Sequence, residues 1–508
     1  MNMKTTNCFA RCIAAAALLL TITIDVAAQS AIYACGHIRR ERETAIDKLR
    51  SSGYTTAIIF NVNVEADGTL TTDFTWDTQT AAEAGGIICQ NGEYVFDEWQ
   101  PYYVDDIKRL LEEPTSIERL ELCVGGWGNG AYGNIKTHND SCGLGEETML
   151  YQNFKALKEV LPEIVAVNND QEQDYDVATA VAFHKMLYEI GYKTTIVPYT
   201  NSSYWRSVVK QLNAAYDDAV EIIYLQTHGG GSGNDPSVWQ QYFDSSIPMY
   251  GSFDCEADPS LERMERDITY LRDNDDIAGA FIWNYNSEDC DVNVWATALN
   301  RIIPPRSDYD VAVTLYEEGD SSGYVVTLPE GAFPQAEMAV YGVTAADISA
   351  VALAGDYVVT LYTGDNLDGD SIVLEADTDL TGTEWDDVMR SIRIVPTAVA
   401  AISSPSVGTS PSTIAIAPGG TAVTIGTTTG ATGGTTGATG GASYTASGGT
   451  TEAASGGTTA VSIYNMAGER VILAYVPCSG GTVSTASLPA GAYVVEAAGI
   501  TKKFIRQR

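Results

Sequence analysis

The sequence has little positive charge. Its 508 residues include 29 lysines and arginines against 66 aspartates and glutamates, which gives a formal net charge of −37 at pH 7. A surface of this kind repels the phosphates of nucleic acids and of anionic lipids. The charge balance therefore argues against a nucleic-acid partner, and the 45% apolar content predicts several packed domains.

The chain also lacks any C-x-x-C motif, so neither a zinc site of that type nor a redox dithiol is expected. Beyond residue 28 the cysteines are Cys35, Cys89, Cys123, Cys142, Cys255, Cys290 and Cys478. An odd number leaves at least one thiol unpaired or paired elsewhere. Oxidation after export is compatible with the pairs Cys89–Cys142 and Cys255–Cys290, although sequence alone does not set the connectivity.

Long apolar runs are missing except near the N-terminus. Lys4 and Arg11 precede the apolar run 13–20, and the small residues of the run 26–28 follow it. This order is typical of an export signal over residues 1–28, with a single membrane helix as the alternative. No other stretch approaches the roughly 20 apolar residues that a membrane span needs, so no span is expected.

Residues 29–303 alternate short β-branched runs with amphipathic stretches. Strands are predicted near residues 31–37, 55–62, 117–124, 163–170, 193–198, 220–226, 247–252 and 277–284. Between them, stretches such as YQNFKALKEVL repeat apolar residues at three and four positions, as helices do. Eight strand and helix pairs predict an α/β fold with one closed (β/α)8 TIM barrel. A doubly wound open sheet is the alternative.

Three segments follow this barrel. Residues 308–396 come after Pro304-Pro305 and repeat internally, because VAVTLYEEGDSSGYVVTLPEG is echoed 46 positions later by YVVTLYTGDNLDGDSIVLEAD, which predicts a small β-sandwich. Residues 402–458 are dominated by Thr, Gly, Ser and Ala and predict a flexible linker. Residues 459–508 contain strand-like runs around glycine turns and predict a small terminal β-sandwich.

Two acids stand where the fourth predicted strand ends. In EIVAVNNDQEQDYD, residues 163–176, alternate positions carry Asn168, Asp170 and Glu172. Alternate side chains of a strand share a face, and the carboxyl ends of barrel strands form the mouth of the active site. Two neighbouring carboxylates do not ionise together cheaply, so one pKa should rise and supply a general acid near neutral pH. Loop capping or pairing with a basic side chain is the structural alternative.

Four patterns in chain order carry a family resemblance. NNDQE sets Asn168, Asp170 and Glu172 on the last three marked positions of D-x-x-D-x-D-x-E. CVGG at 123–126 matches S-x-G-G on the third strand, AIIFNVNVEADGTL at 57–70 is similar to the second strand with its acidic turn, and GAFIWNYN ends the eighth strand with Trp283. With these motifs, the first 270 residues or so of the exported chain resemble glycoside hydrolase family 18, the chitinase-like barrels.

The resemblance implies a retaining hydrolysis that the substrate assists. Glu172 would protonate the glycosidic oxygen, while the N-acetyl oxygen of the substrate attacks the anomeric carbon. Asp170 would orient that acetamido group, and the indole of Trp283 would lie under a sugar ring. The implied partner is a glycan with β-1,4 linkages beside N-acetylglucosamine, as in chitin-like polymers, peptidoglycan fragments or N-glycan cores. No cofactor is required.

The sequence departs from this family's pattern at several positions. Val165 and Asn168 stand where the family has aspartates, which weakens the proton relay behind Asp170. On the sixth strand, where the family shows M-x-Y-D, YLQTHGGG offers Gln226 and His228. A non-catalytic, lectin-like carbohydrate-binding barrel at the cell surface is therefore the alternative to a hydrolase, and a structural or adhesive surface protein is a third hypothesis.

Four further residues are candidates for contact with the substrate: Asn168, Gln226, His228 and Trp127. His228 follows a strand directly and precedes three glycines, which let a ligand approach the backbone. Gln226 brings an amide donor to the same strand end. Trp127 follows the CVGG motif, and both it and Trp205 are expected either to line the cleft or to pack in the core.

The repeated unit at 308–396 resembles the βγ-crystallin fold. Tyr362, Leu367 and Gly369 match its signature of an aromatic, four residues, a bulky residue, one residue and a glycine. The first repeat matches with Tyr316 and Gly323, but has a serine in the middle. The resemblance predicts a Greek-key β-sandwich.

Such domains often bind calcium through [DN]-[DN]-x-x-[ST]-S. In DDVMRS, this makes Asp386, Asp387 and Ser391 weak calcium candidates, because Arg390 stands where a hydroxyl ligand is expected. The other half, AADISA, lacks the acid pair. The stretch DNLDGDS at 365–371 has the wrong spacing for an EF-hand and predicts a hairpin turn.

The last fifty residues resemble the C-terminal sorting domain of the type IX secretion system. SIYNMAGERV, LPAGAYVV and the basic end KKFIRQR carry this resemblance. It implies export through the periplasm of a Gram-negative bacterium, recognition by the type IX machinery, and release or attachment at the cell surface.

Overall fold

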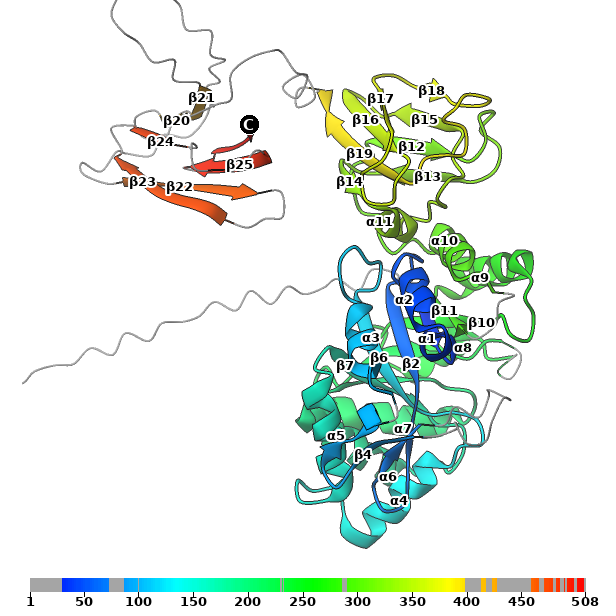
Figure 1. Cartoon of the computed structure of the whole chain (residues 1–508). Coiled ribbons are helices and arrows are strands. Elements are labelled where there is room, and N and C mark those ends of the chain that lie inside the picture. The colour runs from blue at the N-terminus through cyan, green and yellow to red at the C-terminus, as the bar shows by residue number, and fades with distance from the viewer. Residues whose placement is uncertain are drawn as a thin grey trace, which may run out of the picture. The chain divides into compact units, whose positions relative to one another are not determined.

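The structure, a computed structural model, describes two compact units, Met1–Pro396 and Thr397–Arg508 (Figure 1). In the first unit the described residues are 30–72, 86–98, 100–228, 231, 233–285 and 290–396. In the second they are 397, 413–416, 423–426, 458–465, 470–477, 481–484, 488, 491–497 and 500–506. The predicted export signal at 1–28 and most of the predicted linker at 402–458 lie outside the described residues.

Eight parallel strands of the first unit close into a barrel. They are β1 (Ser30–Ala34), β2 (Thr56–Val64), β6 (Arg119–Gly125), β7 (Ile164–Asp170), β8 (Lys193–Ile196), β9 (Val220–Tyr224), β10 (Met249–Asp254) and β11 (Gly279–Tyr285). Each strand pairs with the next in this order, and β1 pairs with both β2 and β11. The closed barrel predicted from the sequence is confirmed, and the open doubly wound sheet is excluded.

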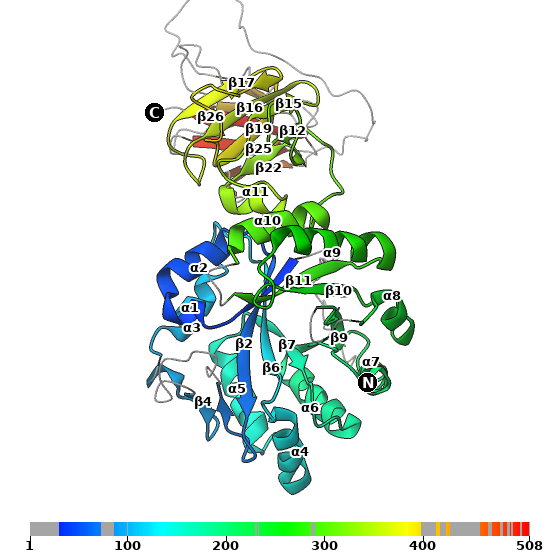
Figure 2. The same cartoon turned by 90° about the vertical axis from the view of Figure 1, so that its right-hand side faces the viewer.

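Helices surround these strands (Figure 2). They are α1 (His37–Arg40), α2 (Arg42–Arg50), α3 (Tyr103–Arg109), α4 (Ala131–Cys142), α5 (Met149–Val160), α6 (Val177–Ile190), α7 (Ser202–Asn213), α8 (Pro236–Trp239), α9 (Leu261–Asp275) and α10 (Val292–Ile302). Asp176 begins α6 by accepting a hydrogen bond from the backbone N–H of Thr179, at 2.8 Å. The apolar stripe of α5, with Phe154 and Leu157, packs into the same core as Leu122 of β6.

Between β2 and β6 the chain leaves the barrel and forms an antiparallel extension that the sequence did not predict. It contains β3 (Leu70–Thr71), β4 (Ile87–Gln90) and β5 (Glu93–Tyr94), followed by a short 3-10 helix, Phe96–Glu98. Strands of two to four residues carry too few alternating positions to be recognised from hydrophobic periodicity.

Residues 313–396 form two antiparallel four-stranded sheets. Their strands are β12 (Val313–Tyr316), β13 (Val325–Leu328), β14 (Gly331–Phe333), β15 (Ala350–Leu353), β16 (Tyr357–Tyr362), β17 (Ser371–Leu374), β18 (Thr378–Asp379) and β19 (Ser391–Pro396), with α11 (Gln335–Val340) after β14. The orders are β13-β12-β15-β18 and β14-β19-β16-β17, so each repeat places its third strand in the other sheet. One apolar cluster contains side chains of both sheets, including Leu315 and Leu361.

This β domain contacts the barrel at the end where the strands begin. The side-chain amide of Asn300 donates to the carbonyl oxygens of Gly53, at 2.8 Å, and Ala339, at 2.9 Å. Arg306 forms ion pairs with both Glu118 and Glu337. Because Gly53 precedes β2 and Glu118 precedes β6, these contacts lie at the amino ends of the strands, opposite the ends that carry the acids.

The second unit consists of two antiparallel sheets. Its strands are β20 (Thr413–Ile416), β21 (Val423–Gly426), β22 (Thr458–Asn465), β23 (Arg470–Pro477), β24 (Gly481–Ser484), β25 (Gly491–Ala497) and β26 (Ile500–Arg506), in the orders β21-β20-β24 and β23-β22-β25-β26. β20 and β21 fall inside the segment predicted as a linker. Their β-branched runs, TIAI and VTIG, account for this difference. Within the described part of the chain, no helix has the length and apolarity to cross a membrane.

Candidate active site

The two acids of the sequence motif share one hydrogen-bond donor. The side-chain nitrogen of Gln226 lies 3.1 Å from Oε1 of Glu172 and 3.4 Å from Oδ1 of Asp170. Asp170 is the last residue of β7, and Gln226 follows β9 by two residues, so the carboxyl ends of the two strands bring the three side chains together. Asp170 is only 4% exposed, whereas Glu172 is partly exposed.

Burial changes the acidity of both carboxyl groups. Burial, with the charge of Glu172 as a second cause, raises the pKa of Asp170 well above its ordinary value. Burial also raises the pKa of Glu172, while the hydrogen bond from Gln226 acts in the opposite direction. The pair therefore keeps a proton to higher pH than isolated carboxyl groups do, and the more exposed Glu172 is the one that can pass it to a ligand.

Asn168, the third residue on this face of β7, is completely buried. It accepts a hydrogen bond from the hydroxyl of Tyr33 at 2.8 Å and donates to the hydroxyl of Thr195 at 2.9 Å. The intervening Asn169 faces the other way, where its amide lies 2.8 Å from Nε2 of His184 on α6. The sequence interpretation of Asn168 as a substrate contact therefore needs correction, because its side chain is completely buried and is bonded inside the barrel to Tyr33 and Thr195.

Trp283 lies among aromatic side chains next to the acids. Its ring centroid is 5.1 Å from that of Tyr33 and 5.1 Å from that of Phe60. Phe60 and Asp170 both lie beside Gly126. A Cβ atom on this glycine would be 3.2 Å from Cζ of Phe60 and 3.9 Å from Oδ2 of Asp170. Gly126 has a φ of +115°, and this glycine lets the aromatic wall and the carboxyl group approach the backbone.

His228 follows Gln226 in the loop after β9 and is held by the neighbouring strand. Its Nδ1 lies 2.6 Å from the hydroxyl oxygen of Ser252 on β10, and its ring packs against Phe281 at 6.4 Å. Burial lowers the pKa of His228, and the charge of Asp254 acts in the opposite direction. The nitrogen of His228 that is bonded to Ser252 therefore does not serve the acids. Two of the three glycines after it lie outside the described residues.

The two other tryptophans of the sequence interpretation differ in exposure. Trp127, in the loop after β6, is 75% exposed and follows Gly126 directly. Trp205 is completely buried and packs on Tyr175 and Tyr204, so it does not line a cleft. An exposed aromatic side chain is one that a sugar ring can stack on.

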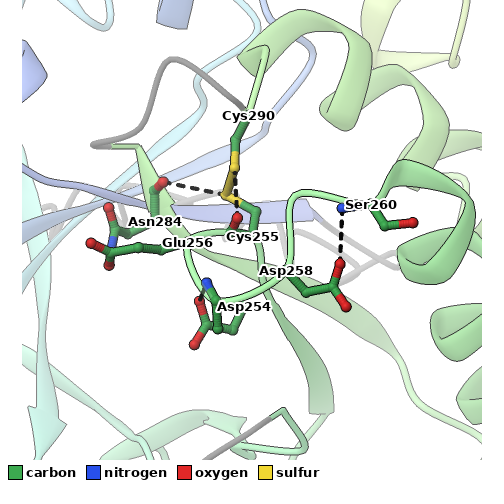
Figure 3. Close-up of a disulfide and its surroundings, with 8 residues drawn as sticks. Asp254, Cys255, Glu256, Asp258, Ser260, Asn284 and Cys290 are labelled. Atoms are coloured by element: carbon green, nitrogen blue, oxygen red, sulfur yellow. Dashed lines mark hydrogen bonds between the residues drawn. A yellow bond between two sulfur atoms is a disulfide. The ribbon is translucent and has the colours of Figure 1, made fainter.

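A disulfide fixes the loops after β10 and β11 (Figure 3). Cys255 and Cys290 are bonded, as one of the two predicted pairs. Beside them, the amide of Asn284 donates to Glu256 at 2.8 Å, and the N–H of Cys255 donates to the carbonyl of Trp283 at 2.7 Å. The disulfide therefore supports the wall that contains Trp283.

The other predicted pair is wrong, because Cys89 and Cys142 are free thiols. Cys89 is buried on β4 in the core beneath α5, whereas Cys142 is exposed at the end of α4, beside His138. Loop lengths gave no information about which face of each element the two thiols occupy.

The weak calcium candidates use their oxygens within the β domain. Asp386 accepts from Ser349 at 2.7 Å and from the N–H of Gly382 at 2.7 Å. The hydroxyl of the buried Ser391 donates to Gly364 at 2.6 Å. Among the residues that the structure describes, no group of three or more His, Cys, Asp or Glu could hold a metal ion. Calcium binding, with Asp387 included, stays a prediction.

Several residues of the site carried no sequence signal of their own. Tyr33 stands alone on the first strand, and Phe60 entered only as part of a longer pattern. Glu121, on β6 below the acids, was detectable in one respect, because it is a charge inside the apolar run LELCV. A charge within a buried strand requires partners, and these are described below.

Comparisons with known proteins cover a small part of the chain. No family model matches it, and no curated protein does. Similar solved structures are βγ-crystallin domains. One from Flavobacterium johnsoniae is 32% identical, with 17% of this chain and 96% of that chain covered and a TM-score of 0.17. The N-terminal domain of Protein S is 28% identical (17% and 96% covered, TM-score 0.16), and a domain from Clostridium beijerinckii is 25% identical (16% and 95%, TM-score 0.16).

Proposed function

We propose that this protein is a glycoside hydrolase that cleaves β-1,4 linkages beside N-acetylglucosamine, of the chitinase or endo-β-N-acetylglucosaminidase type. The observation that carries the proposal is the bridge from the amide of Gln226 to Asp170 and Glu172, at the carboxyl ends of two strands of a closed barrel. Two acids with raised pKa values in a site of this position are typical of acid catalysis on a glycosidic bond.

Each side chain has a role in the proposed reaction. Glu172, the more exposed acid, donates its proton to the glycosidic oxygen as the bond to the anomeric carbon breaks. The acetamido oxygen of the substrate forms the new bond to that carbon, and water later releases the product with retained configuration. Asp170 accepts a hydrogen bond from the N–H of the acetamido group, and the amide of Gln226 holds both carboxyl groups in position. Trp283 and the exposed Trp127 offer aromatic faces to sugar rings.

The test offers chitin oligomers and N-glycoproteins to the purified protein and follows the products by mass spectrometry. The expected result is cleavage by the parent and a loss of about 100-fold or more in Glu172→Gln, the usual contribution of a general acid. Glu159→Gln, a change of the same kind at an exposed position of α5, is the control. Equal cleavage by the parent and Glu172→Gln would contradict the role of Glu172.

Glycan binding without cleavage is the second candidate function. It is favoured by the residue after the sixth barrel strand. Where the resembling family has a tyrosine, this chain has His228, whose Nδ1 is bonded to Ser252, so the hydroxyl group of that tyrosine is missing beside the acids. In that case the same oligomers bind in calorimetry and remain intact, and Trp127→Ala weakens their binding.

The location of the protein is proposed from the ends of its sequence. An export signal at 1–28 and a sorting segment at 459–508 would send it through the periplasm to the type IX machinery and then to the cell surface or medium. Removal of residues 459–508 should leave the protein inside the cell envelope, as measured by fractionation and immunoblotting. Unchanged release of the shortened protein would contradict the proposed sorting role of these residues.

A further inference from the structure

Below the two acids, the barrel interior contains one completely buried carboxylate, Glu121 on β6. Four groups direct hydrogens at it. Oε1 accepts from Nε of Arg119 at 2.7 Å and from the hydroxyl of Tyr224 at 3.0 Å, and Oε2 accepts from the hydroxyl of Thr195 at 2.6 Å and from Nδ2 of Asn168 at 3.4 Å. A side chain that only accepts, opposite an arginine, is a carboxylate anion.

These bonds determine how the amide of Asn168 is turned. Its nitrogen donates to Thr195 and Glu121, so its oxygen faces Tyr33, whose hydroxyl donates to it at 2.8 Å. Both amide hydrogens therefore point to β8 and β6, away from Asp170. The hydroxyl hydrogen of Tyr33 is also committed to Asn168 and is not available to Asp170.

The same geometry explains why residue 168 is an asparagine. A carboxylate there would face Oε2 of Glu121 at about the present 3.4 Å, in a fully buried part of the barrel. Two like charges at this separation are strongly unfavourable away from water. The barrel thus holds a single carboxylate at this level, and it lies on β6 instead of β7.

We infer that Glu121 is a positioning residue of the candidate site. It fixes the direction of the hydrogen bonds that Asn168 and Tyr33 make, so that neither side chain donates a hydrogen bond to Asp170. This inference rests on the proposed function, because it assigns Glu121 a part in keeping Asp170 protonated. Glu121 acts through Asn168 and Tyr33 and makes no contact with a substrate.

Replacement of Glu121 by glutamine should reverse the chain of bonds. The amide introduced at this position donates to Asn168, whose own amide then turns its oxygen to β6 and its nitrogen to Tyr33. Tyr33 becomes an acceptor there, and its hydroxyl hydrogen is free for Asp170. The titratable groups that face Asp170 are Tyr33 of β1, Cys123 of β6, Tyr132 of α4, Glu172, and Tyr175 in the loop before α6. Among them, Tyr33 is the one whose hydrogen bond depends on Glu121.

The first experiment needs no activity. It compares the melting temperatures of Glu121→Gln, Asn168→Asp and the double variant at pH 7, with Glu221→Gln as control, since Glu221 pairs with the same Arg119 at the partly exposed rim. Each single variant should melt at least about 3 °C below the parent, and the double variant should recover most of the loss. Additive losses, or an Asn168→Asp protein as stable as the parent, would overturn the inference.

The second experiment measures the pH dependence of kcat/KM on a chitin oligomer, or of oligomer affinity if no cleavage occurs. In Glu121→Gln, the alkaline limb should move to higher pH by about half a unit or more, because Asp170 loses its proton more readily and its negative charge then holds the proton on Glu172, the general acid. Glu221→Gln should keep the parent profile. An active parent with an unchanged profile in Glu121→Gln overturns the positioning role. A parent that neither cleaves nor binds overturns the proposed function. The melting comparison then still shows whether the barrel requires its buried carboxylate at position 121 and an amide at position 168.

Discussion

The amide nitrogen of Gln226 lies 3.1 Å from Oε1 of Glu172, across the carboxyl ends of β9 and β7. This bond opposes the effect of burial on Glu172, because a donor favours the ionised carboxyl group. The position of the donor on a second strand means that the acidity of Glu172 depends on the closure of the barrel.

Replacement of Gln226 by methionine keeps the length of the side chain and removes the donor. Because the hydrogen bond lowers the pKa of Glu172, its loss should raise that pKa and move the alkaline limb of the pH–rate profile to higher pH. The rate at the optimum should fall about tenfold as the two carboxyl groups lose their shared contact. Gln211→Met, at an exposed position of α7, is the control. A profile identical to that of the parent would contradict the role of Gln226.

Asp170→Asn should stabilise the protein at pH 8 and leave it almost unchanged at pH 4. Burial raises the folded-state pKa of Asp170 above its unfolded value, so the folded protein holds a proton that the unfolded chain releases. Stability is then lost as pH rises above the unfolded pKa of about 4, until the folded group also ionises. Asparagine removes this loss.

Thermal unfolding at a series of pH values checks this expectation. The gain in melting temperature should grow between pH 4 and pH 8, and Asp217→Asn, at an exposed position, should show no such trend. A constant difference across the range would mean that Asp170 is not the group responsible.

The sequence predicted the barrel and the shared face of the acids because both follow from local periodicity. Asp170 and Glu172 alternate after an apolar strand, and the position of that strand in a closed barrel brings Gln226 to them. The role of Asn168 was not predictable in the same way. Its partners Tyr33, Glu121 and Thr195 come from three other strands, and hydrogen bonds across a barrel leave no trace in the spacing of residues.

Two further differences from the sequence prediction also concern features that residue spacing does not show. The pairing of Cys89 with Cys142 depended on which face of β4 and of α4 the thiols occupy, and sequence separation contains no information about this. The extension between β2 and β6 uses strands that are too short for a periodic signal.

Asn300→Leu should destabilise the first unit as a whole. The amide of Asn300, which is completely buried, satisfies the carbonyl oxygens of Gly53 in the barrel and Ala339 in the β domain. An apolar side chain removes both hydrogen bonds, each of which contributes about 0.5–1.5 kcal/mol, although Gly53 keeps the hydroxyl of Ser30 at 3.4 Å and Ala339 keeps the N–H of Gly342 at 3.0 Å. Urea unfolding measures the change, and Asn274→Leu, on the exposed face of α9, is the control. Unfolding of the barrel at an unchanged urea concentration would show that it does not depend on this contact.

Loss of the disulfide should affect both stability and the site. The bond between Cys255 and Cys290 closes a loop with a sequence separation of 35 residues, for which the chain-entropy relation gives about 3–4 kcal/mol. Cys255→Ala with Cys290→Ala should therefore unfold at lower urea concentration, and dithiothreitol should have the same effect on the parent and none on the variant. Because the disulfide holds the backbone of Cys255, whose N–H donates to the carbonyl of Trp283, the variant should also bind chitin oligomers more weakly. Weaker folding with unchanged oligomer affinity would separate the two effects and show that the wall around Trp283 keeps its shape without the bond.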